Sequence, residues 1–329
     1  AAGATHLLFG THALIYDYVS FDRLGLVVID EQHRFGVQQR GKLHAKGENP
    51  DLLVLTATPI PRTLALTLYG DLDISTIDTL PPGRLPTRTV WRTHDVRDKV
   101  YEFVKQQVQE GGQVYIVYPV IERSDQSDLE SVEEAYEELS QETFAGLRVG
   151  MIHGRIKSKQ RDEVLKRFWA RELDVLISTT VVEVGLDNPN ATVMLIEHAE
   201  RFGLAQLHQL RGRIGRGKKQ ATLVALAHRP LSEMARRRLE LFASTTDGFR
   251  IAEADLELRG PGEVFGVRQS GLPVFRAVHI AADRDLIEAS RNLLQRLSAS
   301  ADRLDGAHRK LYHYLQTAAS EKEMLLGGG

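Results

Sequence analysis

The chain has 329 residues, of which 42% are apolar and 26% are charged, and its formal net charge at pH 7 is -2. This composition is typical of a globular protein of two or three domains and excludes a uniformly basic nucleic-acid coat, although not a local basic track. The chain has no cysteine, which excludes disulfides, thiol catalysis and zinc ribbons. No apolar stretch approaches the roughly 18 residues that a membrane helix needs, so the cytosol is the expected compartment.

The first block of the chain contains three apolar runs, at residues 6–11, 24–29 and 52–55. Runs of this length bounded by turn residues, with helical patterns between them, predict buried strands of a parallel α/β sheet. Three strands make a small sheet, so we expect the later part of a domain. The segment 81–86 contains three prolines and one glycine and is expected to be the linker that ends this block.

Asp30 and Glu31 follow the second apolar run and place two adjacent carboxylates at the end of a strand. Nucleotide hydrolases use such a pair to hold Mg²⁺ and to orient the attacking water. We predict that Asp30 binds the metal through its water shell and that Glu31 polarises the nucleophilic water. Two acids that simply cap a buried strand are the alternative.

A phosphate-cradling loop of the type G-x-x-x-x-G-K-[ST] normally precedes such a carboxylate strand. None lies before Asp30, so we expect a chain that starts inside its first domain and does not hydrolyse ATP alone. The segments 36–42 and 212–218 do spell G-x-x-x-x-G-K. Both lack the Ser or Thr that binds Mg²⁺, and neither lies between a strand and a helix, so neither is expected to bind phosphate.

Thr56 and Thr58 follow the third apolar run, where small hydroxyl residues can link the carboxylate site to a moving part. A plain turn is the alternative.

Beyond the linker, six further strands with helices between them predict a second α/β block that is complete enough to fold alone. The strands are expected at residues 89–92, 114–118, 147–152, 175–178, 193–196 and 222–226.

Two helices stand out in this second block. The clearest is expected at residues 158–170, with apolar residues on one face. The acid-rich segment 122–142 is expected to be an amphipathic helix with a solvated acidic face. A partner-binding acidic arm is the alternative for this segment.

Polar residues also follow the strands of the second block. The segment 178–187 offers hydroxyls, including that of Thr179, for a nucleic-acid backbone, and Gly185 and Asp187 for nucleotide or relay contacts. His153 follows another strand and is expected to contact the nucleic-acid backbone in the same way. For both segments a turn whose polar groups satisfy one another is the alternative.

The segment 209–216 carries the strongest chemical signal. Phosphoryl transfer spreads charge over equatorial oxygens, and an inserted guanidinium stabilises that charge where water cannot. Arg213 and Arg216 are three residues apart and flanked by glycines that permit close backbone approach, so they suit arginine fingers. A basic loop that binds nucleic-acid phosphates without catalysis is the alternative.

The pattern changes after residue 230. A helix with three consecutive arginines is expected at 231–243, followed by a Gly- and Arg-rich stretch at 247–271 without clear periodicity. Two closing helices are expected at 282–297 and 307–319.

In this order, the motifs resemble those of a superfamily 2 helicase, and specifically the C-terminal part of the RecG-type branch-migration helicases. Gln32 and His33 complete the carboxylate box of that family, and the segment 56–63 matches its third motif. The segments ending at Asp187 and Arg216 match its fifth and sixth motifs. The segments 247–256, 259–263 and 268–271 resemble the translocation element that RecG shares with the transcription-repair coupling factor. The likeness covers residues 5–297.

The resemblance implies two RecA-like lobes that close on Mg-ATP, at residues 1–85 and 86–230, the first of them incomplete. A translocation element at 231–297 and a helical tail at 298–329 follow. Asp30 and Glu31 are expected to meet Arg213 and Arg216 across the cleft. The other nucleotide contacts implied are His33, Gly185, Asp187 and Gln209. Those implied for DNA and translocation are Thr56, Thr58, His153, Thr179, Arg250, Arg259 and Gln269.

The function implied is that of an ATP-driven double-stranded DNA translocase that remodels stalled forks and branch-migrates Holliday junctions. Its cofactors would be ATP and Mg²⁺, and its partners forks, four-way junctions and a single-strand-binding protein. A monomer in the bacterial cytoplasm, associated with the nucleoid, is expected. The wedge domain of the family is absent from this sequence, so weak and salt-sensitive DNA binding is expected of the chain alone.

Two alternatives remain. A transcription-repair coupling translocase shares the translocation element, but Gln32 and His33 favour the RecG type. A non-catalytic module that binds DNA or a partner is disfavoured because the carboxylates and Arg213 and Arg216 are all intact.

Overall fold

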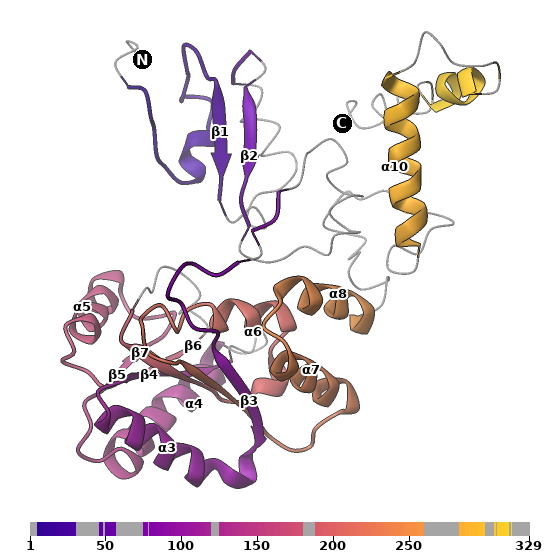
Figure 1. Cartoon of the computed structure of the whole chain (residues 1–329). Helices are drawn as coiled ribbons and strands as arrows, with labels where there is room; N and C mark the ends of the chain where they lie inside the picture. The colour runs from indigo at the N-terminus through magenta and orange to yellow at the C-terminus, as the bar shows by residue number, and fades with distance from the viewer. Residues whose placement is uncertain are drawn as a thin grey trace. The chain divides into compact units, whose positions relative to one another are not determined.

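The computed structural model describes residues 5–30, 46–48, 50–56, 75–77, 79–119, 125–179, 188–259, 283–299, 306, 308–315 and 317 (Figure 1). The chain divides into two compact units. One consists of Ala1–Pro59 and Thr76–Arg259, and the other of Ile60–Ser75 and Gly260–Gly329.

A six-stranded parallel sheet forms the centre of the larger unit, and it confirms the predicted α/β class. Its strands lie in the order β3-β8-β7-β4-β6-β5. Each pair of neighbours runs parallel, as expected where crossover helices join the strands. The strands are β3 (Arg88–Thr93), β4 (Gln113–Tyr118), β5 (Val149–Ile152), β6 (Val175–Thr179), β7 (Ala191–Ile196) and β8 (Thr222–Ala227). All six predicted strands are therefore present.

Alternation along these strands divides the core into two clusters, one on each face of the sheet. In β4, Val114 and Ile116 pack in one cluster, whereas Tyr115 and Val117 pack in the other. All residues of β6 and β7 are buried, which is the pattern of strands covered on both faces.

Helices cover both faces of the sheet (Figure 1). One face packs against α3 (Arg97–Gln109) and α4 (Asp125–Glu138), which contribute Val104 and Val132. The opposite face packs against α5 (Ser158–Trp169), α6 (Leu204–Arg211), α7 (Glu233–Ser244) and α8 (Gly248–Arg259). Their apolar residues, including Leu207, Leu239 and Ile251, form one continuous core with the sheet.

Two of the predicted helices are confirmed with small changes. The helix expected at 158–170 is α5, and Leu165 and Phe168 on its apolar face are buried. The acid-rich segment contains α4, followed by a π-helical turn at Leu139–Thr143. It buries Val132 and Leu139 while Glu133 stays exposed, so the amphipathic helix is confirmed.

The region after residue 230 differs more from the prediction. The helix expected at 231–243 begins at Glu233, because the Ser232 side chain accepts a hydrogen bond from the Ala235 amide at 3.2 Å and caps it. The stretch at 247–271, in which no periodicity was visible, contains α8. The Asp247 carboxylate accepts from the Phe249 amide at 2.9 Å and starts this helix.

The first block contains a two-stranded parallel sheet of β1 (Leu26–Ile29) and β2 (Asp51–Val54). The strand expected at 6–11 is wrong. The segment is irregular and Phe9 is 88% exposed, because no described strand lies beside it to complete its hydrogen bonds. A short 3₁₀ helix, His12–Ile15, follows it.

The predicted linker contains a tight turn, in which the Arg84 amide donates to the Pro81 carbonyl at 3.1 Å and Gly83 has a φ of +80°.

In the smaller unit, α10 (Arg284–Ala299) and the helical residues 308–315 correspond to the two predicted closing helices. Among the described residues, no helix has both the length and the apolar character to cross a membrane.

Candidate nucleotide and DNA site

The predicted site residues of the first block follow the carboxyl ends of β1 and β2. Ile29 pairs with Val54, and the Leu55 amide donates to the Ile29 carbonyl at 2.8 Å. This register brings exposed Asp30 and Thr56 to the same edge of the small sheet. Open α/β sheets bind ligands beyond this edge. Glu31, His33 and Thr58 lie outside the described residues.

His153 and Thr179 occupy the equivalent edge of the large sheet. Ile152 pairs with Ser178, so the two predicted DNA-contacting residues stand at the ends of neighbouring strands. Both are buried, at 7% and 4% exposure. The Thr179 hydroxyl has no hydrogen-bond partner among the described residues.

The His153 ring is a neutral hydrogen-bonding group. The Arg155 amide donates to its Nδ1 at 3.3 Å, and its Nε2 lies 3.8 Å from Glu133 of α4. Burial lowers the pKa of His153 below its usual value of 6.5, and the nearby Arg155 adds to the effect. A neutral imidazole beside a buried hydroxyl can bind a phosphate backbone through hydrogen bonds rather than charge. Gly185 and Asp187, predicted to follow on the same segment, lie outside the described residues.

The two predicted arginine fingers lie on a loop that follows α6, here named the arginine loop (residues 212–217). Arg213 is half-buried, and Arg216 is exposed with its Nε donating to the Gly212 carbonyl at 3.3 Å. Gly215 has a φ of +70°, and a Cβ there would approach Thr87 Oγ1 to 3.0 Å. The loop therefore needs glycine at this position. Gln209, predicted to contact nucleotide, is half-buried in the last turn of α6.

The linker braces the arginine loop. The Arg84 guanidinium donates to the Gly212 carbonyl at 3.3 Å and to the Ile214 carbonyl at 3.5 Å. The sequence predicted a linker at this position but no contact with the loop. Only the proximity of Arg84 to the stiff Pro81 turn could have suggested a fixed direction for its side chain.

The residues expected in the translocation element are only partly described. Arg250 is exposed on the first turn of α8, and Arg259 is the last residue of that helix. Gln269 lies outside the described residues.

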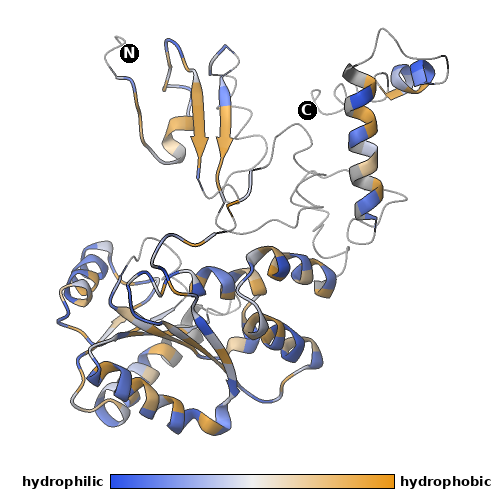
Figure 2. Cartoon of the chain, in the orientation of Figure 1, coloured by the Kyte–Doolittle hydropathy of each residue, from blue (hydrophilic) through white to orange (hydrophobic). Residues whose placement is uncertain are grey.

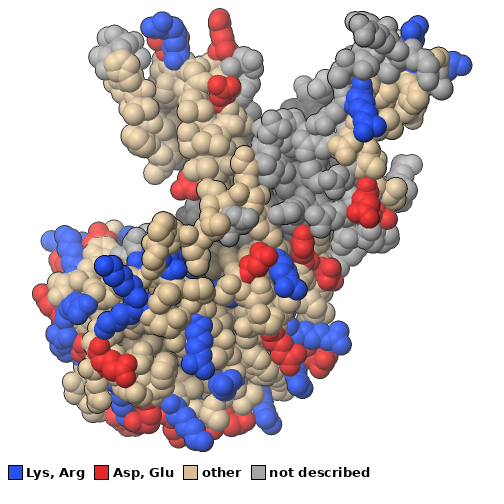
Figure 3. Space-filling model, in the orientation of Figure 1, with Lys and Arg blue, Asp and Glu red and all other residues tan. Residues whose placement is uncertain are grey.

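On the face shown in Figure 3, Lys and Arg side chains are interspersed with Asp and Glu over the larger unit, which contains the six-stranded sheet. The absence of a uniformly basic coat on this face agrees with the composition.

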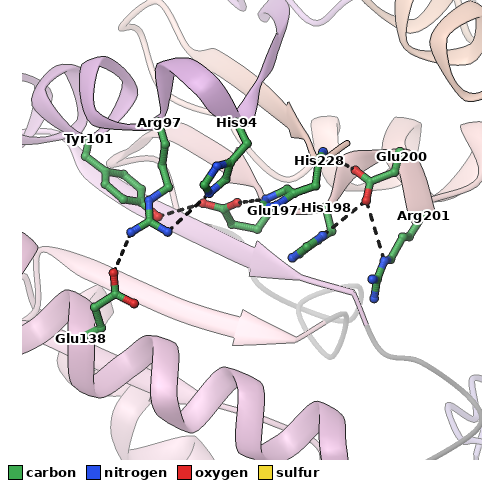
Figure 4. A network of polar contacts seen from close by, with 9 residues as sticks. All are labelled: His94, Arg97, Tyr101, Glu138, Glu197, His198, Glu200, Arg201 and His228. Carbon is green, nitrogen blue, oxygen red and sulfur yellow. Dashed lines mark hydrogen bonds and ion pairs between the residues drawn. The ribbon is translucent and has the colours of Figure 1, made fainter. Parts of the chain in front are cut away.

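A polar network at the carboxyl edge was not expected from the sequence (Figure 4). The His228 ring contacts the rings of His94 and His198, with centroid distances of 4.1 and 3.6 Å. The buried Glu197 carboxylate accepts from the Tyr101 hydroxyl at 2.9 Å and lies 3.1 Å from His228 Nε2. The network joins the loops that follow β3, β7 and β8 to α3.

Within this network the pKa of His94 is lowered from its usual value of 6.5. Burial lowers the pKa of His94, and the neighbouring His228 and Arg97 lower it further. The contacting rings of His94 and His228 lie more than a hundred residues apart along the chain, so no local spacing could have revealed the network. We interpret the network as support for the loops that follow β3, β7 and β8.

Comparison with known proteins identifies the class of this fold and site. Residues 95–218 match the helicase conserved C-terminal domain, and residues 245–316 match the C-terminal part of domain 3 of the ATP-dependent DNA helicase RecG. The parallel sheet with its arginine loop is thus the RecA-like lobe of a helicase. The DUF1998 helicase MrfA, solved with DNA, shares the fold at a TM-score of 0.50 and 20% identity.

Curated relatives make the assignment specific. RecG of Synechocystis is 48% identical over 328 residues, which cover 100% of this chain and 39% of the relative. RecG of Thermotoga maritima is 50% identical over 295 residues, which cover 90% of this chain and 38% of the relative. A structure of RecG bound to a three-way DNA junction matches with a TM-score of 0.63 and 48% identity, covering 85% of this chain and 35% of that one.

The chain belongs to the RecG type of helicase and corresponds to the C-terminal helicase portion of these proteins. It spans less than half the length of the curated relatives that it matches.

Proposed function

We propose that the chain is the C-terminal motor part of an ATP-driven double-stranded DNA translocase that remodels stalled forks and branch-migrates four-way junctions. The observation that carries the proposal is the arginine loop. Two arginines stand on a loop whose backbone is held by the linker and by a glycine at which a side chain would be strained. Such rigidity is expected where guanidinium groups must meet a phosphoryl group with fixed geometry.

Asp30, Glu31, Arg213 and Arg216 form the proposed hydrolytic site. The exposed Asp30 carboxylate at the end of β1 fits a Mg²⁺ ion held through water, and Glu31 would polarise the attacking water. Bound Mg-ATP supplies the phosphoryl group whose hydrolysis drives the motor. Arg213 and Arg216 would stabilise the charge that develops on it. His33, Gly185, Asp187 and Gln209 are proposed as further nucleotide contacts.

Two sets of residues are proposed to meet DNA. Thr56, Thr58, His153 and Thr179 would contact the backbone at the carboxyl edges of the two sheets. Arg250, Arg259 and Gln269 would contact the DNA during translocation and move it. Branched DNA is proposed as the substrate because a relative of 48% identity has been solved on a three-way junction. A single-strand-binding protein as partner, a monomeric state and a location at the bacterial nucleoid complete the proposal.

Phosphate release tests this function. We would compare the product of the complete reading frame that encodes this chain with the 329 residues alone. The complete product should hydrolyse ATP faster with a three-way junction than with linear duplex, whereas the chain alone should not hydrolyse it. Phosphate release from the chain alone, or no response of the complete product to DNA, would contradict the proposal.

The arginine fingers are tested in the same assay. Arg216→Lys keeps the charge but loses the planar fork, and should slow hydrolysis by about 10³-fold. Arg167→Lys is the matched control, because that side chain is 57% exposed on α5 and lies 3.5 Å from Glu172, outside the proposed site and translocation element. A DNA affinity that falls while hydrolysis persists would favour the alternative of a phosphate-binding loop.

A further inference from the structure

Gln113, the first residue of β4, carries a buried amide side chain at the amino edge of the large sheet. It is only 3% exposed. Its Nε2 donates to the carbonyls of Phe168 and Leu173, at 2.6 and 2.7 Å. A buried amide costs stability unless its hydrogen bonds are made, and these two bonds hold both ends of the loop that follows α5.

The same side chain also fixes the turn that leads into β7, here named the asparagine turn (residues 188–190). Asn188, which is 1% exposed, donates from Nδ2 to Gln113 Oε1 at 3.1 Å. Its own Oδ1 accepts from the Asn190 amide at 3.0 Å, and the Gln113 amide donates to the Asn190 carbonyl at 2.9 Å. The exposed Arg171 donates to the Asn190 side chain. Every bond is directional, so the turn has one position relative to β4.

The asparagine turn supports the end of the arginine loop. A Cβ on Gly217, the last residue of that loop, would collide with the Pro189 carbonyl oxygen, so the two backbones lie in close contact. Unlike Gly215, Gly217 has no left-handed conformation, and the close approach alone accounts for a glycine here. Arg84 binds carbonyls nearer the start of the loop, so the turn is a second and separate support.

The turn also follows directly on other proposed nucleotide contacts. Gly185 and Asp187 immediately precede it in the sequence, and the loop that rests on it carries Arg213 and Arg216. A guanidinium stabilises a developing charge only from a fixed position, and a displacement of about 1 Å can slow a reaction about 10²-fold. The position of the turn is therefore expected to affect hydrolysis.

We propose that Gln113 and Asn188 are positioning residues that hold the asparagine turn as a seat for the arginine loop, and thereby set the positions of Arg213 and Arg216. This inference rests on the proposed function, because it assigns the two amides to the hydrolytic site. Apolar contacts alone would leave the loop free to slide, since they are non-directional.

The first experiment measures the loop directly and needs no nucleotide. Because the chain has no cysteine, cysteines placed at exposed Lys218, beside the loop, and exposed Glu163, on α5, accept two spin labels specifically. The distribution of distances between the labels should broaden about two-fold in Asn188→Ala, because the seat loses its fixed position. Leu195→Ala, which empties a buried site elsewhere in the sheet, is the control and should leave the width unchanged. An unchanged width in Asn188→Ala would overturn the inference.

The second experiment measures ATP hydrolysis by the product of the complete reading frame, with a three-way junction present. Asn188→Ala should lower kcat about ten-fold and leave KM for ATP within about two-fold, because the arginines act on the transition state. Leu195→Ala should stay within about two-fold in both constants. An unchanged kcat in Asn188→Ala would refute the role of the turn.

A double substitution separates positioning from a loss of folded enzyme. In the Arg216→Lys background, Asn188→Ala should lower kcat less than about two-fold further, because both changes act through the same guanidinium. A full ten-fold loss in that background would mean that Asn188 acts independently of the arginine loop, and would exclude the proposed role.

Gly217→Ala keeps the test decisive if Asn188→Ala does not fold. This position is half-buried at the end of the loop, and the added Cβ should displace the loop from Pro189, broaden the label distances and lower kcat about ten-fold. Unchanged distances and kcat would overturn the inference. If the unsubstituted protein shows no DNA-stimulated hydrolysis, the proposed function itself fails and the inference with it. An active unsubstituted protein whose variants keep its kcat refutes the inference alone.

Discussion

The two parallel sheets of this chain both contain apolar strands (Figure 2), but their strands are buried to very different extents. In β1, Leu26 and Val28 are 56% and 53% exposed. In β7, every residue is buried, including Val193 and Leu195 at 0%. The six-stranded sheet has described helices on both faces, whereas one face of β1 and β2 has no such cover among the described residues. An apolar run thus predicts a strand that needs cover, but not which segment supplies it.

The largest expected effect of this difference is on independent folding. A fragment of residues 86–259 contains both core clusters of the large sheet and should unfold in one cooperative thermal transition. In a fragment of residues 1–80, the described residues form only the small cluster around Val27 and Ile29, and the fragment should show no transition. Circular dichroism measures both, and a cooperative transition of the shorter fragment would remove the distinction between the sheets.

Matched substitutions should sharpen the comparison. Leu195→Ala removes a fully buried side chain and should lower the free energy of unfolding by about 3 kcal/mol. Leu26→Ala removes one that is half in solvent, and should cost less than about 1 kcal/mol. Urea unfolding of the whole chain gives both values, and equal losses would show that Leu26 is covered in solution.

Acid should weaken the large unit through His208. Its pKa falls from an ordinary 6.5 to about 4 in the fold, so below pH 6.5 the unfolded chain binds more protons than the folded one. The stabilisation is complete above pH 6.5 and is lost as the pH falls towards 4. Lowering the pH from 7.5 to 5 should therefore cost about 2 kcal/mol. His208→Gln should flatten this dependence in urea titrations, and an identical slope would exclude His208 as its cause.

The smallest effect concerns the backbone of the arginine loop. Gly215→Ala places a side chain at a φ of +70° and close to Thr87 and Ala221, and should cost about 1–2 kcal/mol. Gly25→Ala, with no atom within 4 Å of the added Cβ, is the control in the small sheet. Thermal unfolding compares them, and equal midpoints would mean that the loop adapts to the new side chain.

The sequence predicted the repetitive parts of this molecule well. Every strand of the large sheet was found, because buried parallel strands are unbroken apolar runs bounded by turns. The strand at 6–11 failed because an apolar run cannot show whether a neighbour will pair with it. The helix α8 was missed because its apolar residues do not form a single stripe: Phe249 and Leu256 share one side of the helix, whereas Ile251 lies on the opposite side. An Asp247 cap and tertiary packing decide its structure instead.

For the site, the sequence supplied candidates whose roles stay predictions. Motif order singled out Asp30, Arg213 and Arg216, because the residues of each motif are neighbours in the sequence. Arg211 stands in the sequence among other basic residues, yet its side chain is only 5% exposed and donates to the carbonyls of Phe242 and Thr245, more than thirty residues away along the chain. Main-chain acceptors leave no mark in a sequence, so a residue that binds them is visible only in the fold.

The contact between Arg84 and the arginine loop has a consequence for how this family can vary. Connections between domains usually tolerate inserted residues at little cost. Here an insertion between Arg84 and the start of β3 at Arg88 would draw the Arg84 guanidinium away from the carbonyls of Gly212 and Ile214. The length of this connection is therefore set by the geometry of the loop that it supports. Under the proposed function, a lengthened linker should lower the rate of ATP hydrolysis.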